Sequence, residues 1–165
     1  MTERGVYLDE YLDTIRASIE TGLGCKTDLF TGQFGEEDLK KINVPASGIM
    51  VLVTGAGGPL RKGLRPGEVE STIGAGALVI AKADRSGNGF SRAASQATQK
   101  LLGILHNTPI AAAKAPNSIE FLEWGEETSG FKTSSAYSVW SLIWQQTLIL
   151  KTRRLQKLSA TRLLD

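Results

Sequence analysis

The stretch AYSVWSLIWQQTLIL, residues 136–150, is the densest apolar run in the chain and carries two of its three tryptophans. β-Branched and aromatic residues recur along it, which favours a long strand. In a strand, one face would carry Trp140, Leu142, Trp144, Leu148 and Leu150, and the other Tyr137, Val139, Ile143 and Ile149 with Ser141, Gln145 and Thr147. We therefore expect one face in the core and one half-polar face. A helix is the alternative, with Trp140, Ile143, Trp144, Thr147 and Leu148 on one stripe.

The chain before this stretch predicts helices and strands that cover it. Residues 7–23 form an amphipathic pattern, which predicts a first helix that ends at Gly22 and Gly24. Its apolar positions are Leu8, Leu12, Ile15, Ile19 and Leu23. Residues 25–30 predict a short strand, residues 32–35 a turn, and residues 36–42 one or two helical turns. The apolar, β-rich residues 47–53 predict a central strand.

Residues 54–71, TGAGGPLRKGLRPGEVES, contain five glycines and two prolines. This composition predicts an exposed, mobile loop between two antiparallel strands, the second over residues 73–82. After a turn at residues 86–89, residues 90–106 predict a second helix. Its stripe consists of Phe90, Ala94, Ala97, Leu101 and Leu105, widened by Ala93 and Ile104.

Residues 108–116 predict a loop and residues 117–124 an alternating strand, with Ile119, Phe121 and Glu123 on one face. A turn at residues 125–130 leads into the long strand. This order predicts an α+β fold: a mostly antiparallel sheet with two main helices packed on one face, plus the long loop. We expect a single domain over residues 1–150 and a basic C-terminal arm over residues 151–165.

The composition indicates a globular protein, because 41% of the 165 residues are hydrophobic and 22% are charged. The acidic start of the chain is unlike a signal peptide, and no apolar run is long enough to span a membrane. We therefore expect an unprocessed cytoplasmic protein with no membrane partner. The arm has five basic residues against Asp165, a charge of +4, so the rest of the chain carries −2 of the net +2.

The residues that usually carry catalysis are few. His106 is the only histidine, and a cation at its helix end suits the helix dipole. Cys25 has no partner for a disulfide or a CxxC motif, so we expect a small buried hydrophobe. A zinc site is implausible with one histidine and one cysteine. The glycines at residues 54–58 follow a strand but lead into more loop rather than a helix, which argues against a phosphate site. We expect no catalytic residue, no cofactor and no metal, and hence no enzyme.

Exposed basic residues are the candidates for a partner or subunit interface. The loop supplies Arg61, Lys62 and Arg65, and the arm supplies Lys151, Arg153, Arg154, Leu155, Lys157, Leu158 and Arg162. The arm's leucines recur at rough helical spacing, which favours an amphipathic arm that docks on another subunit. A solvated arm and an arm that binds nucleic acid through its Lys and Arg residues are the alternatives.

Four segments carry a resemblance to a known family: YLDEYLDTIRASIE, EEDLKKINVPASGIMVLV, FSRAASQATQKLLGIL and AYSVWSLIWQQTLIL. In order and local character they resemble the tail terminator (tail completion) proteins of tailed bacteriophages, most closely the minor tail proteins of Mu-like, contractile-tailed phages. The resemblance covers most of residues 7–150, and none of its motifs is diagnostic alone.

The resemblance implies a virion protein of the tail or neck, assembled in the host cytoplasm, that forms a homohexameric ring and has no catalytic activity. Its partners would be the tail tube protein, the sheath protein and the neck or head-completion proteins, and nucleic acid would only pass through the ring lumen. The alternatives are a neck or head-completion connector, the same cap in a contractile bacteriocin, and a nucleic-acid-binding module that uses the basic tail and loop.

Overall fold

A computed structural model of the chain describes residues 5–31, 36–41, 44, 48–62, 65–82, 92–110, 113, 118–127 and 137–152. The helices are α1 (Leu8–Leu23), α2 (Glu36–Lys41) and α3 (Arg92–His106). The strands are β1 (Lys26–Leu29), β2 (Ile49–Ala56), β3 (Leu60–Lys62), β4 (Val69–Lys82), β5 (Ile119–Glu126) and β6 (Tyr137–Leu150). The turns predicted at residues 32–35 and 86–89 lie outside the described residues.

The strands form one sheet in the order β1-β2-β4-β6-β5, and β3 pairs with β4 on the β2 side. Of the described strand pairs, β1–β2 is parallel and the others are antiparallel. β4 and β6 pair along their whole length, from Val69 opposite Leu150 to Lys82 opposite Tyr137. The apolar run over residues 137–150 is therefore a strand, as its residue types indicated, and it lies beside the central strand β4.

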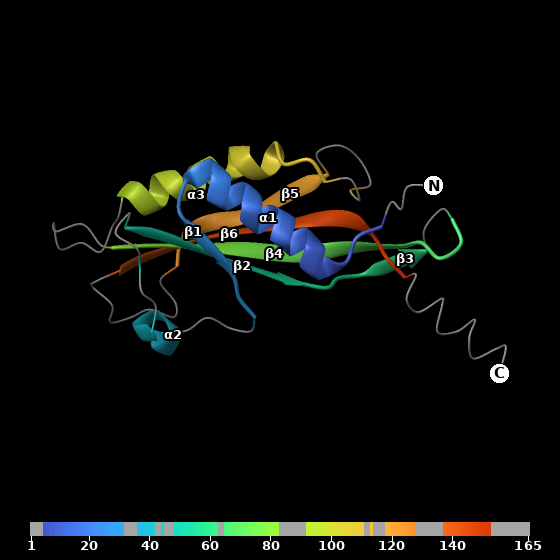
Figure 1. Cartoon of the computed structure of the whole chain (residues 1–165), viewed down its shortest axis with the longest axis horizontal. Coiled ribbons are helices and arrows are strands. Elements are labelled where there is room, and N and C mark those ends of the chain that lie inside the picture. The colour runs from blue at the N-terminus through green and yellow to red at the C-terminus, as the bar shows by residue number, and fades with distance from the viewer. Residues whose placement is uncertain are drawn as a thin grey trace.

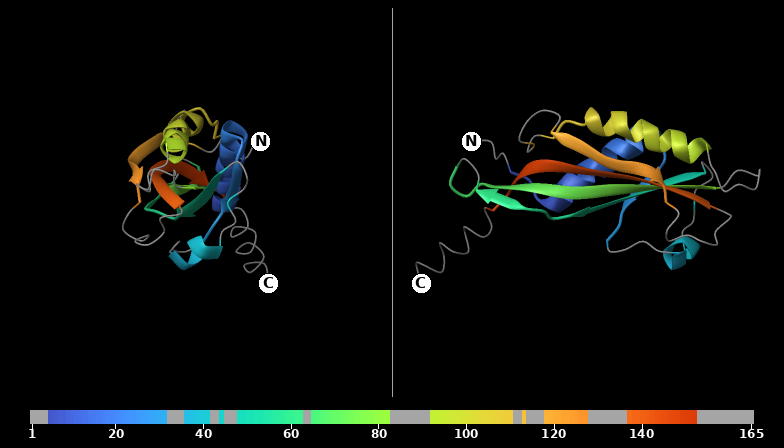
Figure 2. Two further views of the ribbon diagram at one scale, coloured as in Figure 1. Left: turned by 90° about the vertical axis from the view of Figure 1, so that its left-hand side faces the viewer. Right: turned by 180° about the vertical axis from the view of Figure 1, so that it is seen from behind.

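Figures 1 and 2 show α1 and α3 side by side on one face of this sheet and α2 beyond the opposite face. The predicted α+β class, with two main helices on one face of a mostly antiparallel sheet, is confirmed. The buried side chains of α1 and α3 meet the helix-facing positions of the strands in one large cluster. We call the face of the sheet under α1 and α3 the helix face and the other the open face.

The helix face carries the main core. On β6, Leu142, Trp144 and Leu148 have no exposed surface, which confirms the predicted inward face. Ala94 and Ala97 of α3 are buried, and their small side chains let the helix approach the sheet. The open face has a smaller cluster of Met50, Leu52, Ile80 and Val139 at one end.

A chain of buried hydrogen bonds ties α1 to β6. The indole Nε1–H of Trp144 donates to the hydroxyl oxygen of Tyr11 at 3.1 Å, and that hydroxyl donates to Oε1 of Gln146 at 2.7 Å. Nε2 of Gln146 donates to Oγ of Ser118 at 3.5 Å. All buried side-chain nitrogen and oxygen atoms of the described residues have a partner, so these polar groups are buried at little cost.

The glycines predicted to end the first helix have different roles. Gly24 ends α1 in a left-handed conformation with φ 65°, and its N–H donates to the carbonyl of Glu20. Gly22 instead lies inside the helix, where an added Cβ would come within 2.7 Å of Cδ1 of Ile104. Its missing side chain lets α1 and α3 lie close together, so the expectation for Gly22 was wrong.

Half of the loop predicted over residues 54–71 is strand, so that prediction was wrong. Residues 54–56 continue β2, residues 60–62 form β3, and residues 69–71 begin β4. Between β2 and β3, a Cβ on Gly58 would lie 1.8 Å from the carbonyl oxygen of Thr72. The glycine therefore permits a close backbone contact with β4, although glycine-rich composition had indicated a loop. As predicted, β2 and β4 are antiparallel neighbours.

Two predicted side-chain orientations also differ from the structure. The pairing of β5 with β6 shifts between Phe121 and Glu123, so Leu122 is pushed outward and Glu123 no longer shares a face with Phe121. Trp124 then pairs in register with Leu142 and packs near Trp140, with ring centroids 5.9 Å apart. On α3, Ala93 is exposed and does not widen the apolar stripe.

Candidate assembly surfaces

The predicted basic loop residues lie at one end of the sheet, on and beside β3. Arg61 and Lys62 belong to β3, Arg65 follows it, and all three side chains are exposed. Among the described strands, β3 pairs with β4, with Arg61 opposite Glu70 and Lys62 opposite Val69. The three cations are thus carried by a short strand at an edge of the sheet, rather than by a free loop.

The root of the arm lies at the same end and is held by α1. The backbone N–H of Val6 donates to the carbonyl of Ile149, and that of Lys151 donates to the carbonyl of Val6, both at 3.0 Å. Nζ of Lys151 lies 3.3 Å from Oε1 of Glu10 and 5.2 Å from the centre of the Tyr7 ring. Lys151, a predicted interface residue, is therefore bound within its own subunit.

Glu10 is shared between that contact and the start of α1. The backbone N–H of Tyr7 donates to Oε1 of Glu10 at 3.1 Å. This hydrogen bond, aided by Lys151, holds the pKa of Glu10 below its ordinary value. The other arm candidates, Arg153, Arg154, Leu155, Lys157, Leu158 and Arg162, lie outside the described residues. The structure therefore brings Arg61, Lys62, Arg65 and Lys151 to one end of the sheet.

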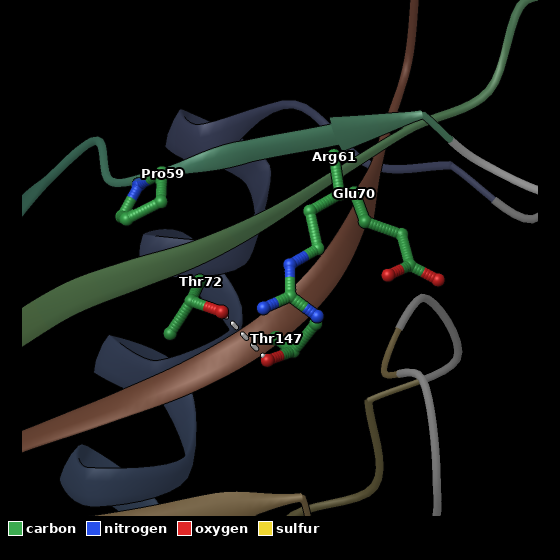
Figure 3. Close-up of a pocket in the computed structure, with 5 residues that line it drawn as sticks. All are labelled: Pro59, Arg61, Glu70, Thr72 and Thr147. Atoms are coloured by element: carbon green, nitrogen blue, oxygen red, sulfur yellow. Dashed lines mark hydrogen bonds between the residues drawn. The ribbon is translucent and has the colours of Figure 1, made fainter.

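A pocket of about 270 Å³ opens on the open face beside β3, lined by Pro59, Arg61, Glu70, Thr72 and Thr147. Figure 3 shows these side chains around it, with the hydroxyls of Thr72 and Thr147 joined by a hydrogen bond of 2.9 Å. The guanidinium of Arg61 extends over this threonine pair. The pocket combines the hydroxyls of Thr72 and Thr147 and the charged groups of Arg61 and Glu70 with apolar surface at an exposed end of the sheet.

An acidic edge that the sequence did not suggest lies on the other side of the sheet. β5 carries Glu120, Glu123 and Glu126, all exposed, and it has no basic residue. Leu122 and Trp124 on the same strand are 53% and 46% exposed. Glu120 accepts a hydrogen bond of 2.7 Å from Nε2 of Gln145, and within the described chain β5 pairs only with β6.

Of the two residues considered for catalysis, one is exposed and the other is buried. His106 is the exposed last residue of α3. Cys25 is buried in the main core, as predicted, and burial raises the pKa of its thiol. The described residues contain no group of three or more histidine, cysteine, aspartate or glutamate side chains placed to hold a metal ion. None of the three described helices is long and apolar enough to cross a membrane.

The strands β3 and β5, and the end at which β3 and the arm root meet, are thus the candidate assembly surfaces in the described part of the chain. Comparison with known proteins gives no name for them: no protein-family model matches the chain, and no curated protein matches it significantly.

Proposed function

We propose that this protein is a structural subunit that caps the head-proximal end of a phage tail tube and sheath. In that role it ends tail polymerisation and forms the joining surface for the neck or head-completion proteins. It works as a homohexameric ring in the virion, with the tube protein as its axial partner and nucleic acid only passing through its lumen. The chemistry of such a cap is binding rather than catalysis.

The observation that carries the proposal is the way in which the four segments of the resemblance pack together. The first helix and the FSRAASQATQKLLGIL helix lie side by side as α1 and α3. Both cover the sheet that contains β2 and the closing strand β6. The hydrogen bonds from Trp144 to Tyr11 and from Tyr11 to Gln146 join the first and last of the four segments in the core. The order that suggested a tail terminator is therefore the order of one packed α+β unit, which supports the proposal.

The exposed surfaces give independent support. A ring-shaped cap needs one contact around the circle and another along the tail axis. β3 and β5 expose apolar and charged side chains on opposite sides of the β4–β6 pair, and the end beside β3 holds the pocket lined by Arg61 and Glu70. Large exposed apolar side chains rimmed by charge are typical of protein-binding surfaces.

The test is a polymerisation assay with the tail tube protein of the same particle. Added before polymerisation, this protein should shorten the tubes and appear as extra density at one end in negative-stain micrographs. Added afterwards, it should decorate one end and leave the lengths unchanged, which controls for a general effect on tube solubility. Unchanged lengths and bare ends in both orders of addition would refute the cap.

Two other results would reassign the protein. Binding to the purified neck proteins without any effect on tubes would make it a connector. Binding to DNA that falls steeply with salt, without either protein contact, would make it a nucleic-acid-binding module.

A further inference from the structure

β3 and β5, which lie on opposite sides of the β4–β6 pair, carry half of the large hydrophobic side chains that are exposed in the described residues. Six large hydrophobic side chains of the described residues are exposed, and three of them, Leu60, Leu122 and Trp124, lie on β3 and β5. Leu60 is 68% exposed, the highest value of the six. Leu122 and Trp124 are two residues apart on β5, and neighbouring exposed apolar side chains on an edge strand indicate a surface that another protein covers.

The same two strands have opposite charges. β3 and the residue Arg65 beside it present three cations, whereas β5 presents Glu120, Glu123 and Glu126. None of these six side chains forms an ion pair in the described part of the chain. Both charge sets are therefore available to a partner, and each complements the other.

The faces of the two strands also correspond. Leu60 and Lys62 pair with Ser71 and Val69, so they point to the helix face, and Arg61 points to the open face. On β5, Trp124 and Glu126 pair with Leu142 and Trp140 and point to the helix face, whereas Glu123 points to the open face with Ile143. Each strand thus has an apolar and a charged residue on the helix face and a charge on the open face.

Charge decides which edges can meet. If β5 of one copy met β5 of another, glutamates would face glutamates, and if β3 met β3, cations would face cations. Like charges on neighbouring strands repel each other. A twofold contact between identical edges is therefore disfavoured. β3 of one copy against β5 of the next is a head-to-tail contact, which repeats around a closed ring or along an open chain.

We propose that β3 of one copy of this chain binds β5 of the next copy. Leu60 packs against Trp124 and Leu122, Lys62 pairs with Glu126, and Arg61 pairs with Glu123. The role of this contact rests on the proposed function, because it would be the interface between neighbouring subunits around a ring-shaped cap. It also explains why a short edge strand keeps Leu60 exposed in the isolated subunit.

The experiment reverses the charge of each edge separately. One variant carries Arg61→Glu and Lys62→Glu, the other Glu123→Lys and Glu126→Lys, and their masses are measured by light scattering at the highest attainable concentration. We expect the wild type to form an assembly and each variant to fall to the 17.7 kDa mass of one chain. An equimolar mixture should regain the assembly, because each reversed edge then meets a complementary one. A chain with all four substitutions should also assemble, which shows that the substituted protein still folds.

The control is Lys82→Glu with Lys100→Glu, which changes the net charge as much as the β3 variant does but alters exposed lysines on β4 and α3. It should assemble like the wild type. A monomeric wild type, or edge variants that keep the wild-type mass, would overturn the contact, and so would a mixture that stays monomeric. These results are read without tail tubes, so they are separate from the capping assay: an assembly that ignores tubes refutes the cap but keeps the contact.

Discussion

The hydroxyl oxygen of Tyr11 lies 2.7 Å from Oε1 of Gln146 in a residue pair separated by 135 positions. The same hydroxyl accepts the indole N–H of Trp144 at 3.1 Å. Tyr11 is 1% exposed and Trp144 is fully buried, so water cannot replace either hydrogen bond. This hydroxyl therefore joins the first helix to the long strand through the centre of the core.

Replacing Tyr11 with phenylalanine removes the hydroxyl and keeps the ring. We expect the free energy of unfolding to fall by about 1–3 kcal/mol, because the buried polar groups of Trp144 and Gln146 lose their shared partner. Urea denaturation measures the change. The matched control is Tyr7→Phe, since Tyr7 is 39% exposed, and it should change stability by less than about 0.5 kcal/mol. Equal effects of the two substitutions would contradict the role of the network.

The pH dependence of stability should report the same hydroxyl. Burial raises the pKa of Tyr11 from 10.0 to about 12, although the hydrogen bond from Trp144 lowers it in part. A folded pKa above the unfolded one means that the stabilisation is fully present below pH 10 and is lost as the pH rises toward about 12. Over that interval the wild type should lose about 3 kcal/mol more than Tyr11→Phe, at 1.36 kcal/mol per pKa unit. Parallel curves for the two proteins would contradict the assignment.

Gly58 and Gly57 are neighbours that should respond differently to alanine. A Cβ on Gly58 would lie 1.8 Å from a backbone oxygen of β4, which no rotamer change can relieve, whereas one on Gly57 would have nothing within 4 Å. We expect Gly58→Ala to cost about 3 kcal/mol through overpacking and Gly57→Ala to be close to neutral. Urea denaturation of the two variants compares them directly. A tolerated Gly58→Ala would show that the connection between β2 and β3 can move away from β4.

Ala94 and Ala93 on α3 form a second neighbouring pair. Ala94 is fully buried against the sheet, and Ala93 is exposed. Ala94→Leu should destabilise the fold by about 1–3 kcal/mol, because the larger side chain pushes α3 away from the core. Ala93→Leu should lie within about 0.5 kcal/mol of the wild type in thermal unfolding. If Ala93→Leu proves the more harmful of the two, the orientation of α3 on the sheet is wrong.

The elements with a strong periodic signal were predictable from the sequence. Residues 137–150 alternate, with tryptophans on the inward face, and α1 and α3 carry apolar stripes, so local sequence and tertiary packing favour the same structure. β3 was not predictable, because its three residues stand among glycines and prolines and are held by pairing with β4 rather than by their own propensity. The bulge at Leu122 was missed for a similar reason, since it depends on the register with β6.

The candidate surfaces were predictable only in part. The cations at residues 61–65 stand out in the sequence, and the structure exposes them as expected. The acidic edge was overlooked because glutamates that alternate with apolar residues also describe an ordinary solvated strand face. That β5 forms an edge, on the side opposite β3, follows from the strand order, which no local pattern encodes. The engagement of Lys151 by Glu10 and Tyr7 likewise joins segments that are distant in sequence.

The joining of α1 to β6 also determines the order of events during synthesis. Tyr11 of the first helix accepts its hydrogen bond from Trp144, 133 positions later, so this partner has not yet been made when the helix emerges from the ribosome. Contacts this distant in sequence form late, because a long loop must close before they contribute stability. β1, β2 and α3 are made earlier and can cover part of the apolar face of α1, but the hydroxyl of Tyr11 stays without its partners until β6 is made. A chain that stops before residue 144 therefore lacks the hydrogen bonds that join its first helix to its long strand.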